Sequence, residues 1–244
     1  MPRADEAVLL GLLQGPAELL PISSSAHVGL LLHWRHPSLS GAARKEIEVA
    51  LHAGTALVLA FERPPVRWRF LAATTAPPAL AGLAFERIVE ERLGTPATVA
   101  AGLVAGAVAM VLADRTPVRR IDPNVVDGLV LGAAQTLALI PGVSRSGATR
   151  SAARARGFGR EDAAALSREV ALPVLAGATA LKAARLIARR PPRATLLALG
   201  AGAAASAAST LAARRVKEPP LVAWAAYRVA LAAAILRVWH DRSR

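Results

Sequence analysis

The sequence predicts an all-helical membrane protein that crosses the bilayer several times. Its 244 residues are 54% hydrophobic, and the mean hydropathy is +0.39. The apolar residues do not alternate with polar ones but gather in blocks, and these approach the roughly 20 residues that span a bilayer as a helix. The basic residues gather between the blocks, which is typical of the loops and interfacial anchors of membrane proteins.

Eight apolar blocks follow one another along the chain, and we expect a helix in each. The shorter blocks suit broken or re-entrant helices better than complete spans. The first block is not expected to be a removable signal peptide, because polar residues interrupt it and no cleavage site follows. The blocks cover residues 7–32, 47–61, 70–85, 97–113, 125–140, 163–187, 194–213 and 221–239.

The net charge of +13 does not indicate a nucleic-acid-binding protein. Most of the basic residues lie in the connections, and aromatic residues, at 4% of the chain, are too few to interleave with them as stacking platforms. Because nearly every connection is basic, the positive-inside rule gives no orientation for the termini. The chain has no Cys, which excludes disulfides and thiol chemistry.

The first block is unusually polar for a membrane segment. Gln14 and Glu18 lie four residues apart and therefore share one face of a helix, which Pro21 is expected to end. The serines at positions 23–25 can then cap a second helix that His27 would begin. Ionisable groups at membrane depth tend to line a cavity or bind a ligand. The alternative is a serine-rich cap beside a solvent-facing Glu18.

A second polar stretch, Pro-Gly-Val-Ser-Arg-Ser-Gly-Ala-Thr, occupies residues 141–149 directly after an apolar block. Pro141 and Gly142 stop regular structure, and backbone N–H groups in a turn that opens a helix can form an anion-binding concavity. Arg145 adds a planar guanidinium that matches phosphate oxygens two at a time. The alternative is a loop that caps a helix with serine and exposes an arginine.

The two polar stretches form a weak internal repeat. Each consists of an apolar helix with a Gly-x-x-Gln pattern, a proline break, a hydroxyl-rich turn and a further helix. Transporter-like folds with inverted repeats bring two such broken helices to one site within the membrane. We therefore expect a single membrane domain over residues 1–244, with repeat halves of about 1–113 and 122–244. The matching positions are Gly11, Gln14, Pro21, Ser23 and Ser25 in the first copy and Gly132, Gln135, Pro141, Ser144 and Ser146 in the second.

Together the two stretches resemble the signature motifs of the bacitracin-resistance type undecaprenyl-diphosphate phosphatases. The resemblance extends along most of the chain, through Ile47-Glu48-Val49, Pro173 with residues 177–181, and Ala226-Tyr227-Arg228. It implies a multi-pass protein of the bacterial plasma membrane, built from interlocked inverted repeats with about six transmembrane helices and two re-entrant helix pairs. The two motifs would meet in one pocket.

The resemblance also implies an activity: hydrolysis of undecaprenyl or another polyprenyl diphosphate to the monophosphate and phosphate, which recycles the lipid carrier for cell-wall synthesis. The partners it implies are the lipid substrate and the membrane, and it leaves a homodimer open. A lipid-phosphate transporter or flippase that uses the same polar site is the alternative function, because inverted repeats and a polar site at the midplane suit a carrier equally well.

The resemblance assigns roles to the motif residues. Arg145 would clamp the transferring phosphoryl group, and Glu18 would hold a divalent cation, Mg²⁺ or Ca²⁺, with weaker help from Gln14. The nucleophile is a serine hydroxyl or a water; Ser24 is favoured, with Glu18 or His27 taking its proton and His27 as candidate acid for the leaving phosphate. The residues expected to bind substrate are Gln14, Ser23, Ser144, Ser146 and Thr149.

Several positions depart from the family pattern. Gln14 stands where better-known members have Glu, which leaves one negative charge for the cation. His52 stands where Gln is common, and we interpret it as a polar helix residue rather than a pocket wall. Arg168 and Glu169 occupy a stretch that is normally apolar, and either pair inside the bundle or lie at the interface. Small residues at Gly102, Gly106 and positions 200–208 predict close helix packing.

Overall fold

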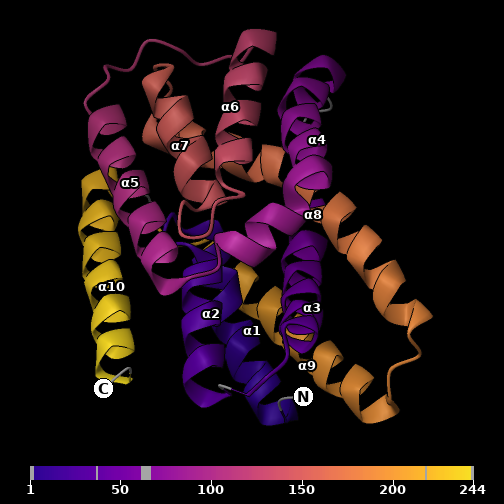
Figure 1. The fold of residues 1–244 in the computed structure, drawn as a ribbon. Coiled ribbons are helices and arrows are strands. Elements are labelled where there is room, and N and C mark those ends of the chain that lie inside the picture. The colour runs from indigo at the N-terminus through magenta and orange to yellow at the C-terminus, as the bar shows by residue number, and fades with distance from the viewer. Residues whose placement is uncertain (1–2, 37, 62–66, 218, 243–244) are drawn as a thin grey trace. The chain divides into compact units, whose positions relative to one another are not determined.

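The computed structural model describes residues 3–36, 38–61, 67–217 and 219–242, and these residues form ten α-helices (Figure 1). Within these ranges no strand occurs, apart from an isolated bridge between Arg120 and Phe158. The all-helical prediction is therefore confirmed. The helices are α1 (Ala4–Leu19), α2 (Ser24–Arg35), α3 (Gly41–Ala60), α4 (Trp68–Arg92), α5 (Pro96–Asp114), α6 (Val125–Leu137), α7 (Arg145–Ala155), α8 (Arg160–Ala188), α9 (Arg193–Ala213) and α10 (Leu221–Arg242).

Four of these helices, α5, α8, α9 and α10, are long and apolar enough to cross a membrane. The shorter helix α6 is also apolar, and large hydrophobic side chains such as Leu112, Leu197 and Val229 are exposed on the spans. An exposed apolar surface of this kind suits lipid rather than water. The chain is a multi-pass membrane protein, while the layout of about six spans with two re-entrant pairs stays a prediction.

The helices group into two compact units, and each unit combines segments that are distant in the sequence. The first unit comprises Met1–Leu19, His27–Pro64 and Leu172–Val216, and the second comprises Leu20–Ala26, Pro65–Ala171 and Lys217–Arg244. Helices α2 and α8 each begin in the second unit and continue into the first. The predicted repeat halves, 1–113 and 122–244, stay a prediction.

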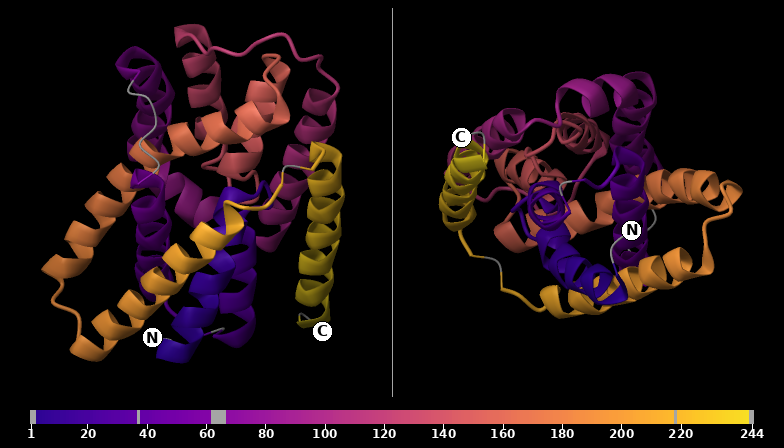
Figure 2. Two further views of the ribbon diagram at one scale, coloured as in Figure 1. Left: turned by 180° about the vertical axis from the view of Figure 1, so that it is seen from behind. Right: turned by 60° about the horizontal axis from the view of Figure 1, so that its bottom comes forward.

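In the first unit, α9 packs closely against α1 and α3 (Figure 2). A Cβ atom placed on Gly11 would lie 2.3 Å from the carbonyl oxygen of Gly202, so the two backbones are nearly in contact. The Ser209 hydroxyl donates to the Gly11 carbonyl at 2.8 Å, and the Ser206 hydroxyl donates to the Leu51 carbonyl at 2.7 Å. The close packing predicted for the small residues 200–208 is confirmed.

In the second unit, α10 lies along α5, and α6 lies along α4 (Figure 1). The core between the helices includes Leu131, Phe158 and Val170, each 0% exposed. A buried carboxylate, Asp127, ties the start of α6 to its neighbours, because it pairs with Arg120 at 2.8 Å and accepts from Arg156 at 2.7 Å. These two arginines offset the cost of burying the carboxylate.

Both proline breaks predicted from the sequence are confirmed. Helix α1 ends at Leu19, two residues before Pro21, and α6 ends at Leu137, four residues before Pro141. Helix α2 begins at Ser24, so the prediction that His27 begins it is wrong by three residues, because the serines themselves form the first turn. Helix α7 begins at Arg145, and the preceding Ser144 caps it by accepting a hydrogen bond from the Gly147 N–H at 3.2 Å.

Candidate functional site

Gln14 and Glu18 lie side by side on α1 within the first unit. The Gln14 side-chain nitrogen Nε2 donates to Glu18 Oε2 at 3.2 Å, so the prediction of a shared helix face is confirmed. Gln14 is 2% exposed and Glu18 is 5% exposed. The alternative of a solvent-facing Glu18 is therefore wrong. A buried carboxylate needs a cation or hydrogen-bond donors to remain ionised, and Gln14 supplies one such donor.

His52, on α3 of the same unit, supplies a second contact to this carboxylate. Its Nε2 lies 3.4 Å from Glu18 Oε2, and its Nδ1 lies 2.7 Å from the backbone carbonyl oxygen of Glu48. The interpretation of His52 as an ordinary polar helix residue is wrong, since the imidazole faces the motif carboxylate. Because both ring nitrogens face oxygen acceptors, the imidazole donates to Glu18 and to the Glu48 carbonyl at the same time only when both nitrogens carry a proton.

The Gln14–Glu18 pair offers little for a metal ion by itself. Within the described residues, no cluster of three or more His, Asp or Glu side chains has the arrangement of a metal site. Ca²⁺ needs six to eight oxygen ligands, whereas Mg²⁺ is often held by one or two carboxylates together with substrate phosphates and water. The donor set fits an Mg²⁺ ion that the substrate helps to hold, and it does not fit a Ca²⁺ cage made by the protein alone.

The second unit contains two turns with the same unusual backbone, which we name the first serine turn (residues 21–25) and the second serine turn (residues 141–146). Ser23 and Ser144 have φ angles of 74° and 68°, a region that non-glycine residues seldom adopt. In both turns the hydroxyl of this serine contacts the hydroxyl two residues later, at 3.2 Å to Ser25 and 3.3 Å to Ser146. The internal repeat therefore extends to the backbone conformation.

The two serine turns are joined directly. The Ser146 hydroxyl donates to the backbone carbonyl of Leu20 at 2.8 Å, and this residue immediately precedes the first serine turn. Ser23, Ser144 and Ser146 are all buried, whereas Ser24 is half-buried. The hydroxyls that were expected to bind substrate thus also hold the turns in place, and their role in substrate binding stays a prediction.

Arg145 is half-buried at the start of α7, and its guanidinium is oriented by α8. Its Nη1 donates to the backbone carbonyl of Ser167 at 3.1 Å. The Thr149 hydroxyl, one turn further along α7, contacts the Ser167 hydroxyl at 2.7 Å and donates to the Arg145 carbonyl at 2.8 Å. The alternative of a helix cap with an exposed arginine is only half correct, since Ser144 caps the helix but Arg145 is held.

Ser167 was missed by sequence reasoning because it lies far from both motifs, in a helix that reads as an ordinary span. Glu169, two residues further on, forms an ion pair with Arg67 at 2.5 Å. The sequence predicted that Arg168 and Glu169 either pair inside the bundle or lie at the interface. For Glu169, pairing is correct. The pair neutralises a side chain of which only 8% is exposed, as a buried carboxylate requires.

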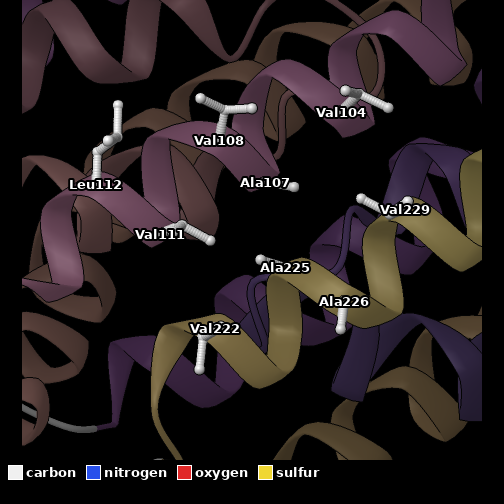
Figure 3. Close-up of a pocket in the computed structure, with 9 residues that line it drawn as sticks. All are labelled: Val104, Ala107, Val108, Val111, Leu112, Val222, Ala225, Ala226 and Val229. Atoms are coloured by element: carbon white, nitrogen blue, oxygen red, sulfur yellow. The ribbon is translucent and has the colours of Figure 1, made fainter.

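An apolar groove of about 380 Å³ runs between α5 and α10 of the second unit (Figure 3). Its floor includes Ala107 and Ala225, which are 3% and 4% exposed, and its rims are valine and leucine side chains. Both helices are candidate membrane spans, and the apolar lining of the groove suits hydrocarbon rather than water. Bilayer lipid and a prenyl tail suit this lining equally. The lining residues are Val104, Ala107, Val108, Val111, Leu112, Val222, Ala225, Ala226 and Val229.

The sequence-predicted site residues are distributed over both units. Gln14, Glu18 and His27 belong to the first unit, while Ser23, Ser24, Ser144, Arg145, Ser146 and Thr149 belong to the second. In the second unit, five of these residues lie in the two linked serine turns, and Thr149 lies one turn further along α7. The prediction that Glu18 and Arg145 line one pocket concerns both units and stays a prediction.

The fold and these side chains define a class: an integral membrane protein that holds an arginine and several hydroxyls at the start of a helix, a combination suited to phosphate groups. The sequence model of the family described as "Bacitracin resistance protein BacA" matches residues 7–234. The chain belongs to this family.

Several curated proteins named undecaprenyl-diphosphatase are similar to the chain. The protein of Moorella thermoacetica is 37% identical over 72% of this chain and 75% of its own length. The protein of Geobacter sulfurreducens is 37% identical over 79% and 80%, and that of Pelobacter propionicus is 39% identical over 74% and 75%. The similarity therefore covers most of each protein.

Proposed function

We propose that this protein hydrolyses undecaprenyl diphosphate, or a similar polyprenyl diphosphate, to the monophosphate and orthophosphate. The observation that carries the proposal is the second serine turn, where Arg145 begins a helix whose first turn is built from hydroxyls and glycine. This arrangement suits a diphosphate head group, since it combines a guanidinium with the favourable dipole at the start of a helix. The name shared by the relatives describes the same reaction.

The proposed chemistry is attack by an oxygen nucleophile on the terminal phosphorus. The bond from that phosphorus to the bridging oxygen breaks, and its electron pair leaves with the lipid monophosphate. Arg145 neutralises the charge that spreads over the transferring phosphoryl oxygens. We assign the nucleophile to the Ser24 hydroxyl, which gives a phosphoserine that water then hydrolyses, with Glu18 or His27 as the proton acceptor.

A divalent cation is part of the proposal, with Glu18 as its carboxylate ligand and Gln14 as a weaker oxygen ligand. The cation would neutralise charge on the diphosphate. Mg²⁺ fits this donor set better than Ca²⁺, because a single carboxylate leaves most ligand positions to the phosphates and water. His52 and Gln14 both contact the same oxygen of Glu18, and this contact fixes which way the carboxylate faces.

The test is release of orthophosphate by purified protein in detergent, supplied with a polyprenyl diphosphate and Mg²⁺. We expect release that stops when EDTA is added and resumes when excess Mg²⁺ is restored. Protein that is folded by its thermal melt but releases no phosphate under any cation would contradict the proposal. Release that EDTA leaves unchanged would remove the cation from it.

A lipid-phosphate transporter or flippase is the alternative, and the same assay separates the two functions. A carrier would move the diphosphate lipid across the membrane of a vesicle without releasing phosphate. The relatives are named for hydrolysis, so no observation favours transport.

We further propose that the protein acts in the bacterial plasma membrane, where the lipid carrier for cell-wall synthesis is used and recycled. A homodimer stays a prediction.

A further inference from the structure

A buried arginine that the proposed reaction does not use lies near the middle of α10. Arg228 is 0% exposed, although it lies in a helix that is long and apolar enough to span a membrane. A charged side chain within such a segment is costly and is retained when it serves a specific purpose. Arg228 is therefore a candidate for a role in the site.

The Arg228 guanidinium donates only to backbone carbonyl oxygens, and these come from three separate segments of the second unit. Nη1 donates to Pro21 at 3.2 Å, in the first serine turn. Nη2 donates to Gly142 at 2.8 Å and to Val143 at 3.0 Å, in the second serine turn. The remaining acceptors belong to α5: Nε donates to Leu103 at 3.1 Å, and Nη2 donates to Gly102 at 3.2 Å.

The surroundings of Arg228 are shaped to admit it. A Cβ atom on Gly106 would lie 2.2 Å from Nη2, and a Cβ atom on Gly147, in the first turn of α7, would lie 2.9 Å from Nη1. The guanidinium therefore occupies space that two glycines leave open. Among the residues that the structure describes, no carboxylate pairs with it. Its positive charge thus adds to that of the α7 N-terminus.

Another buried arginine of the same unit shows what an ordinary structural role looks like. Arg154, at the end of α7, is 4% exposed and also donates to backbone carbonyls, including that of Thr116 at 2.6 Å. It differs from Arg228 in having a carboxylate nearby, since its Nε lies 3.5 Å from Asp114. It also binds no residue of either serine turn. Arg154 is therefore a matched control.

We propose that Arg228 is a positioning residue that holds the two serine turns in register for phosphoryl transfer. Its guanidinium holds the backbone carbonyls of residues 21, 142 and 143 in place. The positions of these carbonyls determine where the serine hydroxyls that follow them lie. The inference rests on the proposed hydrolysis. Since Arg228 acts through the turns, its loss should lower kcat more than it raises KM.

The test compares Arg228→Lys and Arg228→Met with wild type, using phosphate release and a thermal melt in detergent. Lysine keeps the charge and offers three donors, whereas methionine removes both charge and donors. We expect kcat to fall about 10-fold in R228K and about 100-fold in R228M, with KM changed by less than about threefold. Variants that fold and keep wild-type kcat would overturn the inference.

A double-mutant cycle carries the test even if R228M fails to fold. We expect kcat of the double variant to fall by less than the product of the fold losses in R228K and Ser144→Ala, because both variants disturb the same turn. Losses that multiply would overturn the inference and leave Arg228 a general stabiliser. Arg154→Lys is the control: we expect a lower melting temperature, kcat within about threefold of wild type, and a multiplicative effect with Ser144→Ala.

A second variant displaces Arg228 without altering it. Gly106→Ala places a methyl group against Nη2, so it should reduce kcat in the same direction as R228K. Gly82→Ala is its control, since a Cβ there meets nothing within 4 Å. If wild type itself releases no phosphate, the proposed hydrolysis fails. If wild type is active and R228K matches it, only the role of Arg228 fails.

Discussion

The two serine turns share a backbone but differ in chemistry. A constant spacing relates Gly11 to Gly132, Gln14 to Gln135 and Ser23 to Ser144. Both turns place a serine at positive φ directly before a helix, and in both its hydroxyl contacts that of the serine two residues later. The residue between the two serines is Ser24 in the first turn and Arg145 in the second. The first helical position therefore carries a hydroxyl in one copy and a cation in the other.

The helices before the turns differ in the same way. Gln14 donates to Glu18, whereas its counterpart Gln135 donates to the backbone carbonyl of Thr74 at 2.9 Å, and the position matching Glu18 is Leu139. The second copy thus uses its glutamine for packing, while the first copy uses it beside a carboxylate. The duplicated turn thus repeats one geometry, and the residues proposed to carry the chemistry are those that differ between the copies.

The largest effect is expected from removing the guanidinium of Arg145, which has no counterpart in the first serine turn. Arg145→Ala should reduce phosphate release by about 1,000-fold or more, because a guanidinium on a transferring phosphoryl group contributes that much in comparable enzymes. The melting temperature should change little, since Arg145 is only half-buried. Phosphate release measured beside Arg119→Ala, an exposed arginine, checks this. A folded and active R145A would remove Arg145 from the site.

The next largest effect is expected at the carboxylate that only the first copy carries. Glu18→Gln keeps the shape of the side chain and the contact with Gln14, but removes the negative charge and the proton acceptor. We expect kcat to fall about 100-fold, the usual contribution of a general base. Steady-state kinetics at saturating Mg²⁺ provide the measurement. Wild-type kcat in folded E18Q would show that the asymmetry between the copies does not serve catalysis.

A smaller effect in the opposite direction is expected from Gln14→Glu, which gives the first copy two carboxylates. More negative ligands bind a divalent cation more tightly. The Mg²⁺ concentration for half-maximal phosphate release should therefore fall by about 10-fold. The measurement is phosphate release as a function of Mg²⁺ concentration, for wild type and Q14E in parallel. An unchanged half-maximal concentration would argue against position 14 as a cation ligand.

The smallest effect concerns the strained serine itself. Ser144 has φ 68° and ψ 120°, a conformation that glycine adopts without steric cost. Ser144→Gly loses the hydroxyl and relieves the strain, whereas Ser144→Ala loses the hydroxyl only. We expect S144G to be more stable than S144A by about 1 kcal/mol, measured by denaturation in detergent. Equal stability of the two variants would show that the positive φ costs nothing here.

The fold class and the breaks in both motif helices could be predicted from the sequence, because apolar blocks and prolines act locally. The pairing of Gln14 with Glu18 was predictable too, since a spacing of four fixes it on any helix. The contacts of Ser167 and His52 were not predictable, because they depend on how α8 and α3 pack. Arg228 could have been found as a charge well inside the apolar block 221–239, yet its five carbonyl partners belong to distant segments.

The carbonyl partners of Arg228 have a consequence for how the protein is made. Synthesis proceeds from the N-terminus, so Pro21 leaves the ribosome 207 residues before the arginine that binds it, and Gly142 leaves 86 residues before. Until α10 is inserted, the carbonyl groups of both serine turns that accept from Arg228 lack this hydrogen-bond donor. A nascent chain halted before residue 228 would leave these carbonyl groups without the arginine. We therefore expect such a chain to be degraded by membrane proteases as incompletely folded protein.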